Sequence, residues 1–531
     1  MLKSAHAYQP VVRSGHPGET MERSLQVLLK VLLLVLPVPL WAQEGLLRDR
    51  WVQLETENFV IFSQVSASRT ERFGSELEIW RQVVSQIINN GNPLPRAAVQ
   101  NHVYIFADQE GLAQFAPSND AGFFLATPRR NFMALSFGES LSLTQARHHY
   151  VHFLMRNFAD LRIPRWYEEG LAGYLDNLEV DRDRVQLPRY EKREFETSIP
   201  LSREVSLQEL LYDEEALASP RLIQVANLKS ETFLYFLLHA WEEGFTDRRT
   251  QLQEYLRVSL TGRTQRYAFD QAFDISTNNL DREYVKYLEE SSRPRGTLSL
   301  AALQPVPESS ATELSTAQLS SALAELALNA GNFTVAETLF RSAVDSGVAS
   351  ARSYSGVADA LRMQERDDAV YEMREFYDAA EARGADDVEI LLDLGEYWET
   401  VVRDCDSNLT AGDRHAIKAD ILDYFSRALA MAPDNPEANL AMAQYYLLDD
   451  EDFTRGISSQ RKAVATLPAD GFIMEQAVVY AIQEQNYDEA LRLINELSQP
   501  LHLYGEPEWV SALRTRMAQH QQGQSYDACA E

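Results

Sequence analysis

The chain has 531 residues, of which 45% are hydrophobic and 24% are charged, and its formal net charge at pH 7 is −30. Because that length exceeds one ordinary hydrophobic core, we expect two or three domains, and the composition is that of a globular protein. A nucleic-acid partner is excluded, because a phosphate backbone requires a dense basic surface and the sequence has no basic run. We interpret the acidity as a feature that keeps the protein soluble.

The first 42 residues are typical of a secretory signal peptide. Arg23 precedes a mostly apolar run from Leu25 to Leu40, which is too short to span a bilayer and is followed by the small residue Ala42. Met21 stands directly before this pattern and is a second candidate for the start of translation. We therefore expect a protein that is secreted across the inner membrane into the periplasm and keeps no membrane span after cleavage. The alternative is an uncleaved membrane anchor.

Residues 46–140 alternate between strand and helix patterns. Short β-rich runs at 58–62 and 102–106 predict two strands, and apolar residues recurring at three and four positions over 66–89 predict an amphipathic helix. Two further apolar runs, 123–125 and 131–136, flank a proline-containing turn and predict a β-hairpin. This part of the chain is therefore expected to be an α+β domain.

Beyond residue 140 the patterns are helical almost throughout. One helix begins near Ser140 or Ser142, and a second runs from about Arg165 to Asn177, behind Pro164. Further helices are predicted at 207–217, 226–243, 249–261 and 280–291. The stretch 293–315 contains three prolines among Ser, Thr and Ala, which predicts a linker between domains.

Behind the linker, the sequence repeats a pattern of small residues and prolines. Ala428 and Pro433 return one repeat later as Ala463 and Pro468. A helix pair of about 34 residues, with small residues at the helix contact and Pro after the second helix, predicts tetratricopeptide (TPR) repeats over 316–517, followed by a tail at 518–531. Each hairpin buries its apolar face only against its neighbours, so the stack forms a groove that suits a protein or peptide partner. The alternative is a generic α-helical bundle.

Two cysteines occur, Cys405 and Cys529, both in the C-terminal half. An oxidising compartment permits a disulfide between them, which would fix the tail to the repeats. Two isolated thiols are an equal alternative, because sequence alone does not place the two residues within bonding distance.

Three of the ten histidines lie within five residues on the first helix beyond residue 140. His148 and His152 are one helical turn apart, so their imidazoles project from one face and suit a single zinc ion. Glu169, on the second helix, is placed to supply a third ligand. Two His and one Glu, with water in the fourth position, form the ligand set of a catalytic zinc site. The alternative is a solvated helix face on which the histidines occur by chance.

The same residues carry a resemblance to a known family. HHYVH from His148 to His152, followed by a PxWxxEGLA segment from Pro164 to Ala172, resembles the gluzincin, or peptidase MA-like, superfamily, whose members have HExxH and then PxWxxEGLA. The resemblance implies a zincin-like domain at 46–292, with a small mixed sheet, helices and Zn²⁺ held by the two histidines and Glu169. It also implies a peptide substrate that lies along an edge strand at Phe132–Leu135.

One departure from the superfamily concerns the general base. Where its members have Glu after the first His, this chain has His149; that Glu takes a proton from zinc-bound water and later delivers it to the leaving amine. Imidazole has a suitable reference pKa of about 6.5, but it lacks the reach and charge of a carboxylate. Glu168 is a candidate substitute base, and a plain surface carboxylate is the alternative interpretation.

A second departure concerns the groups around the ligands. Gly173 stands where many members have an acidic residue that orients a ligand His, and Asp176 is a candidate replacement. Tyr235 is a candidate to stabilise an oxyanion, as are Tyr167, Tyr174 and His239, with positions in the core or at its rim as the alternative.

Two functions follow from these patterns. The first is an exported zinc metallopeptidase-like enzyme that hydrolyses peptide bonds with zinc-activated water, with His149 in an atypical base position. The second is a catalytically impaired pseudo-peptidase that acts as a TPR-mediated, protein-binding scaffold in the cell envelope. The identity of residue 149 discriminates between the two functions. Because His149 stands in place of the usual Glu, we expect weak catalysis, which favours the second function.

Overall fold

The computed structural model of the chain describes residues 45–524, apart from internal gaps at 90, 117–120, 159–162, 182–183, 187–198, 201–202, 213–216, 218, 262, 291–296, 300–302, 405–408, 449–451 and 499–506. The predicted signal peptide and both cysteines, Cys405 and Cys529, lie outside the described residues. Within the described ranges, every helix is too short or too polar to cross a membrane.

A six-stranded mixed sheet forms the centre of the N-terminal half, in the order β4-β5-β3-β2-β1-β9. Its strands are β1 (Val52–Glu55), β2 (Phe59–Ser63), β3 (Gln100–Phe106), β4 (Gly122–Leu125), β5 (Arg130–Ser136) and β9 (Thr312–Glu313). The neighbours β2, β3 and β5 run parallel, whereas β4 is antiparallel to β5. The two predicted strands and the predicted hairpin are therefore confirmed. The strand β1 was not predicted, because its four residues show only a short alternation.

The strand that carries Phe132 is not at the edge of the sheet, contrary to the expectation from the resemblance. β5 pairs with β3 on one side and with β4 on the other. The hairpin turn folds β4 back outside β5, so β4 is the edge strand. A peptide that adds to this side of the sheet would therefore pair with β4 and not with residues 131–136.

Two helices cover one face of the sheet: α3 (Ala67–Ile88) and α5 (Ser140–Phe158). Alternate strand residues such as Ile61, Val103 and Met133 point to this face and join the core formed with both helices. The predicted apolar stripe of α3 is buried, except for Ile87, which is 38% exposed. The indole of Trp80 donates to the carbonyl of Leu175, which ties α3 to the next helix.

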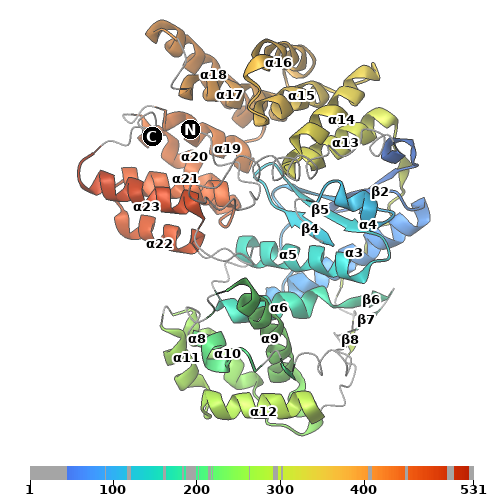
Figure 1. Cartoon of the computed structure of the whole chain (residues 1–531), viewed down its shortest axis with the longest axis vertical. Coiled ribbons are helices and arrows are strands. Elements are labelled where there is room, and N and C mark those ends of the chain that lie inside the picture. The colour runs from blue at the N-terminus through green and yellow to red at the C-terminus, as the bar shows by residue number, and fades with distance from the viewer. Residues whose placement is uncertain are drawn as a thin grey trace, which may run out of the picture.

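That next helix, α6 (Arg165–Asp176), packs between α5 and a helical lobe. The lobe consists of α8 (Leu207–Tyr212), α9 (Pro220–His239) with a 3₁₀ turn at Ala240–Glu243, α10 (Arg249–Ser259), α11 (Gln265–Ala272) and α12 (Thr277–Glu290). Figure 1 shows it as a separate group of helices at the far end of the molecule from α15–α18. A small second sheet, β6 (Glu179–Asp181), β7 (Arg184–Gln186) and β8 (Thr297–Ser299), lies beside it.

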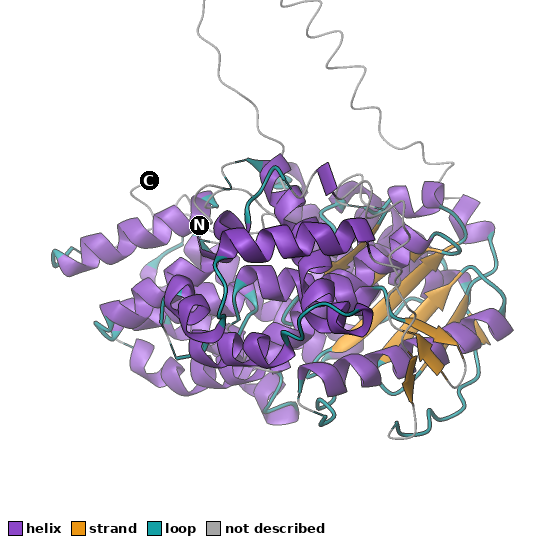
Figure 2. Cartoon of the chain, turned by 90° about the horizontal axis from the view of Figure 1, so that it is seen from below, coloured by secondary structure: helices purple, strands orange, loops and turns teal. Residues whose placement is uncertain are grey.

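The C-terminal half is a curved row of helix pairs, which we call the helical arc. Its helices are α13 (Thr316–Asn329), α14 (Phe333–Asp345), α15 (Ala351–Met363), α16 (Val370–Gly384), α17 (Val388–Arg403), α18 (Ala411–Met431), α19 (Pro436–Tyr446), α20 (Phe453–Thr466), α21 (Gly471–Gln483), α22 (Tyr487–Leu497) and α23 (Glu508–Gln521). Each helix packs against the next along the chain, so the predicted helical region is present. Figure 2 shows the strands gathered at one end of the molecule, with helices making up the rest.

The arc is not a separate unit behind a free linker. The second face of the sheet, with Phe62, Tyr104 and Phe132, shares one core with helices α13 to α17. The Tyr104 hydroxyl donates to the carbonyl of Ala322 on α13 at 2.9 Å. The predicted linker 293–315 itself supplies β8 and β9, one strand to each sheet. The proline-rich composition of this segment predicted irregular backbone, but it did not predict that two short strands there pair with the sheets.

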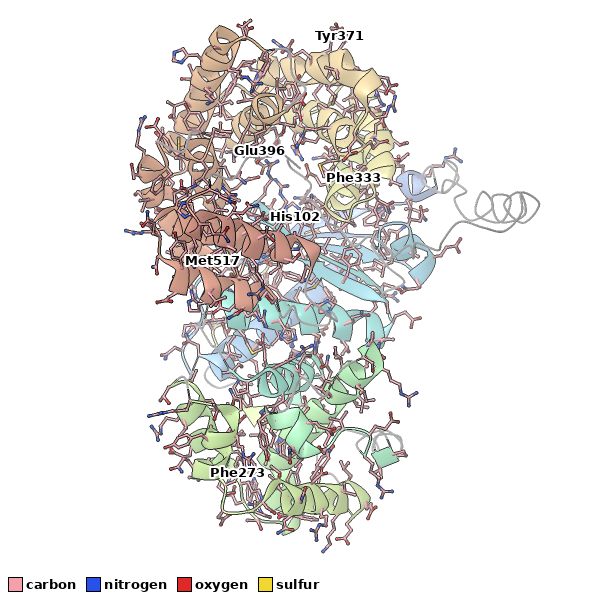
Figure 3. The ribbon with its side chains drawn as sticks, turned by 60° about the vertical axis from the view of Figure 1, so that its left-hand side comes forward. His102, Phe273, Phe333, Tyr371, Glu396 and Met517 are labelled. Carbon is pink, nitrogen blue, oxygen red and sulfur yellow. The ribbon has the colours of Figure 1, made fainter. Side chains whose placement is uncertain are left out.

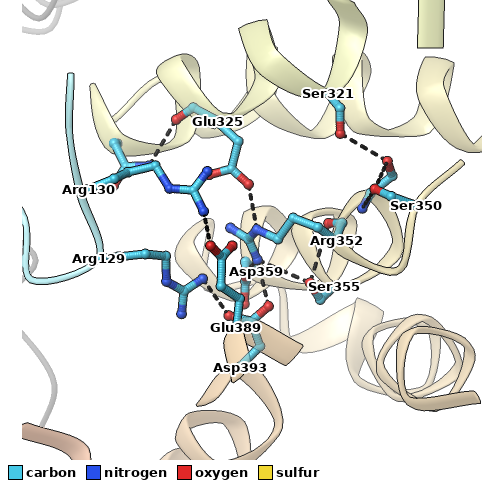
Figure 4. A network of polar contacts seen from close by, with 12 residues as sticks. Arg129, Arg130, Ser321, Glu325, Ser350, Arg352, Ser355, Asp359, Glu389 and Asp393 are labelled. Carbon is cyan, nitrogen blue, oxygen red and sulfur yellow. Dashed lines mark hydrogen bonds and ion pairs between the residues drawn. The ribbon is translucent and has the colours of Figure 1, made fainter. Parts of the chain in front are cut away.

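The arginines at the turn between β4 and β5 point toward carboxylates of the arc (Figure 4). Arg129 donates to Asp393 on α17 at 2.7 Å and to both carboxylate oxygens of Glu437 on α19 at 2.8 and 2.9 Å. Arg130 pairs with Glu389, one turn before Asp393. The arginine side chains of this turn are 12–14% exposed, so the pairs are largely removed from water.

Carboxylates outnumber arginines where the turn enters the arc. Burial raises the pKa of Asp393, but Arg129 and Arg352 outweigh it and hold that pKa below its usual value. At the nearby Glu396 the balance is reversed: burial, followed by the charge of Glu437, outweighs Arg129 and Arg362 and raises its pKa to about 8. Arg129 is therefore a main counter-charge for this acidic side of the arc.

The arc returns to the sheet domain at its other end. The loop after α20 donates a backbone hydrogen bond from Ala469 to the side chain of Asn157 at 3.1 Å, near the end of α5. Leu467 and Ile473 join the same core as Phe153 of α5. The arc thus holds the sheet domain at both ends, with the Arg129–Arg130 turn between them.

We predict that Arg129→Met lowers the stability of the folded chain by about 3–5 kcal/mol, because Asp393 and Glu437 would remain buried without their shared cation. The measurement is the shift of the unfolding transition in urea, followed by circular dichroism. Arg50→Met is the matched control, since Arg50 also joins the sheet domain to a distant segment, at Glu313, but both side chains are more than half exposed. That exposed pair should contribute at most about 1 kcal/mol. Equal effects of the two substitutions would contradict the proposed role of the buried pair.

Candidate metal centre

Three ligating groups converge where α5 packs against α6. The Nε2 atoms of His148 and His152 lie 3.1 Å apart. Glu169 places Oε2 3.4 Å from the first of these nitrogens and 3.8 Å from the second. Ligands held about 2.0–2.2 Å from one tetrahedral zinc ion lie roughly 3.4 Å from one another, so the separations suit a single ion. Within the described residues, these three form the one group of His, Cys, Asp and Glu side chains that could hold a metal.

The helix that carries Glu169 is positioned by close packing behind it. A Cβ atom on Gly170 would lie 2.6 Å from the backbone oxygen of Ser230 on α9, so only glycine allows the two helices to approach this far. At Gly173 the corresponding Cβ would lie 2.8 Å from the carboxyl carbon of Glu231, also on α9. The EGLAG segment therefore serves two purposes: it supplies a candidate ligand and it seats α6 against the helical lobe.

The other ring nitrogen of His148 is held by Asp176, near the end of α6. Nδ1 of His148 lies 2.8 Å from Oδ2 of Asp176, which is 4% exposed. Burial alone would lower the pKa of His148, but the hydrogen bonds to Asp176 and Glu169 raise it to about 10. Burial raises the pKa of Asp176 to about 6 despite the His148 contact. A carboxylate behind the distal nitrogen of a ligand imidazole fixes its orientation and increases its basicity.

His152 has an equivalent support from Glu168. Its Nδ1 lies 3.1 Å from Oε1 of Glu168, and Arg156 donates to both oxygens of that carboxylate at 2.6 and 3.0 Å. Burial raises the pKa of Glu168, but these hydrogen bonds outweigh it and hold the pKa below its usual value. Glu168 is therefore an ionised, buried carboxylate that orients the candidate ligand His152, and not the surface carboxylate of the alternative interpretation.

The remaining predicted residues differ in position. His149 follows His148 on α5, is partly exposed, and has its ring 5.9 Å from that of His148 at a steep angle of 73°. Tyr235 is buried on α9, where its ring packs 4.6 Å from that of His239 and 6.3 Å from that of Tyr174. The Tyr174 hydroxyl and the His239 Nε2 are 3.0 Å apart. These three side chains form a small packed group between α6 and α9.

The sequence named Asp176 as a candidate for such a supporting role, but it did not indicate Arg156. Helical spacing could have indicated both positions. Asp176 is seven residues after Glu169 and so on the same face of α6, and Arg156 is four residues after His152 on α5. The hydrogen-bond partners themselves depend on the crossing of α5 and α6, which no local pattern specifies.

The sequence matches no family model, and no curated protein is significantly similar to it.

We predict that Asp176→Asn weakens zinc binding about 10–100-fold, because a neutral amide supports the His148 imidazole less than a carboxylate does. Competition against a chromophoric chelator measures the affinity. Asp378→Asn is the matched control on an exposed helix face, where that residue pairs with Arg374 of the same helix. His148→Ala should abolish stoichiometric binding. Zinc affinity that is unchanged in both His148→Ala and Asp176→Asn would rule out this site.

Proposed function

We propose that this chain is an exported zinc-metallopeptidase-like protein with a TPR-type helical arc. The observation that supports the proposal most is the pair of supported imidazoles: His148 and His152 each turn Nε2 toward Glu169 while a carboxylate holds Nδ1. Such double support is typical of metal ligands. The signal-peptide pattern of the first 42 residues supports export to the periplasm.

The donor set fits a catalytic ion better than a structural one. Structural zinc sites use four protein ligands, mostly Cys and His, whereas two His and one Glu leave a position for water. Zinc bound there would lower the pKa of that water and polarise a scissile carbonyl. His148, His152 and Glu169 would hold the ion, and Asp176 and Glu168 would keep both imidazoles in the orientation that binding requires.

The general base is the weak part of this site. His149 occupies the sequence position of the missing Glu, and the substitute Glu168 is committed to His152 and Arg156. A carboxylate whose pKa is held low by a bidentate arginine is a poor proton acceptor. We therefore propose peptide-bond hydrolysis at a low rate.

The second candidate function is a protein-binding scaffold in the cell envelope, with the metal centre impaired. The same missing base favours it. The groove of the arc is not fully open, however, because the Arg129–Arg130 turn occupies the side formed by α17 and α19. A partner that enters this part of the groove must displace the turn, so we propose partner binding on the rest of the arc.

We predict that His149→Glu increases chelator-sensitive proteolysis of casein by about 10²–10⁴-fold, because the change restores a carboxylate base beside an intact ligand set. The initial rate is measured with and without 1,10-phenanthroline, and zinc content is checked in both proteins.

Two controls make this test specific. His149→Gln should bind zinc without gaining activity, since it lacks a base. Glu168→Gln in the His149→Glu background should lose activity together with zinc affinity, because it removes a ligand support. Strong wild-type proteolysis that survives His149→Gln would contradict our account of the base, and full zinc binding with no proteolysis in His149→Glu would favour the scaffold.

A further inference from the structure

One arginine lies behind the carboxylate that supports His152. Arg156 is one helical turn beyond His152 on α5, and it donates to both oxygens of Glu168, from Nε at 2.6 Å and from Nη2 at 3.0 Å. Two parallel hydrogen bonds fix the plane of a carboxylate, which otherwise turns easily about its terminal bond. The oxygen that accepts from Nε, Oε1, is also the one that lies 3.1 Å from Nδ1 of His152. Arg156 therefore sets the direction from which Glu168 supports the imidazole.

The support of His148 is built differently. Asp176 places Oδ2 2.8 Å from Nδ1 of His148, and within the part of the chain that the structure describes its other oxygen accepts no hydrogen bond. Asp176 is 4% exposed, so this support is enclosed. The side chain of Arg156, in contrast, is 37% exposed, although that of Glu168 is only 5% exposed. Of the two supports, the one behind His152 therefore extends to the surface of the sheet domain.

The helical arc meets the sheet domain beside Arg156. The next residue, Asn157, accepts a hydrogen bond at 3.1 Å from the backbone of Ala469, in the loop between α20 and α21. Figure 3 shows the C-terminal helices of the arc, around Met517 on α23, beside the sheet domain. The arginine that orients Glu168 is thus adjacent in sequence to the residue that the arc binds.

Asn157 joins the arc to the last turn of α5. Its side-chain amide donates to the carbonyl of Phe153, four residues earlier, at 3.1 Å. Phe153 itself packs in one core with Leu467 and Ile473 from the two ends of the α20–α21 loop. The last turn of a helix frays readily unless other contacts hold it. These contacts from the arc therefore hold the turn that carries Arg156.

The charge of the arc also acts on Arg156. Burial lowers the pKa of Arg156, but the hydrogen bond and charge of Glu168, followed by the charges of Glu169 and Glu496, outweigh burial and raise that pKa. Glu168 and Glu169 are on α6, whereas Glu496 is on α22 of the arc. The guanidinium is therefore stabilised both by the metal centre and by the arc.

From these contacts we infer that Arg156 is a positioning residue through which the helical arc acts on the metal centre. The arc holds the last turn of α5, that turn presents Arg156, and Arg156 orients Glu168 behind His152. A partner protein that draws the α20–α21 loop away from Asn157 loosens this support and weakens metal binding. The inference rests on the proposed function, since it requires His152 to be a metal ligand.

The first test concerns Arg156 in the full chain. Arg156→Gln removes the charge and the paired hydrogen bonds, and it should weaken zinc binding about tenfold. Arg156→Lys keeps the charge without the planar fork and should recover part of the affinity. Competition against a chromophoric chelator measures zinc affinity, and the visible absorption bands of bound Co²⁺ report the geometry of the ligands. Arg156→Gln should shift these bands at saturating Co²⁺, which a loss of stability alone would not do.

The second test concerns the contact with the arc. Asn157→Ala removes the acceptor for Ala469 and should weaken zinc binding about threefold. In the Arg156→Gln background the same substitution should weaken binding no further, because the arc acts through Arg156. Asn329→Ala is the matched control and should bind zinc as the wild type does. Asn329 ends α13 with the same kind of side-chain hydrogen bond, to the carbonyl of Glu325 at 2.9 Å.

The unfolding midpoint of each variant shows that it is folded. The inference is overturned if Arg156→Gln keeps both the zinc affinity and the Co²⁺ bands of the wild type. Additive losses in the double variant, or an equal loss in Asn329→Ala, would overturn it as well, because the arc would then not act through Arg156. A wild type that binds no zinc would refute the proposed metal centre itself, and the inference with it.

Discussion

The candidate site depends on holding two imidazole nitrogens 3.1 Å apart inside the protein. Such a pair is favourable only if a hydrogen bond at Nδ1 fixes the orientation of each ring and a negatively charged group faces both Nε2 atoms. All three carboxylates that meet this requirement, Glu168, Glu169 and Asp176, come from the single helix α6. The crossing of α6 over α5 therefore determines whether the site exists, and the close contact at Gly170 holds the other side of α6 against α9.

The helical arc contacts the sheet domain on the face opposite to this site and again beside α5. At one end α13 covers the far face of the sheet through Tyr104, and at the other the α20–α21 loop reaches Asn157 on the metal-site helix. Between them, Arg129 lies in an acidic part of the arc. The arc therefore forms an outer layer of the sheet domain. Its buried carboxylates Asp393 and Glu437 pair with Arg129 of that domain.

Local patterns predicted much of this structure. The apolar stripe of α3, the hairpin around Arg129 and the start of α6 behind Pro164 all follow from short-range rules, because a periodic pattern and a turn residue suffice. The two histidines and Glu169 were placed together by helical spacing and a motif, and the structure brings them within 4.8 Å of one another. The metal itself, the peptidase activity and the TPR assignment stay predictions.

What the sequence did not predict depends on long-range contacts. The interior position of β5 follows from a hairpin that folds outward, and the strand in the expected linker pairs with residues some 260 positions earlier. The contact of Glu168 with His152 depends on a helix crossing, and the ion pairs of Arg129 join segments at least as far apart in the chain. No periodicity within one element carries such information.

Zinc K-edge X-ray absorption of the purified chain tests the central claim most directly, since it reports the ligands and not only the metal content. Our account predicts one zinc ion per chain with two imidazole nitrogens and one carboxylate oxygen, all at about 2.0–2.2 Å, and a further oxygen from water. A protein that retains no zinc after dialysis, or a coordination shell without two imidazoles, would contradict it.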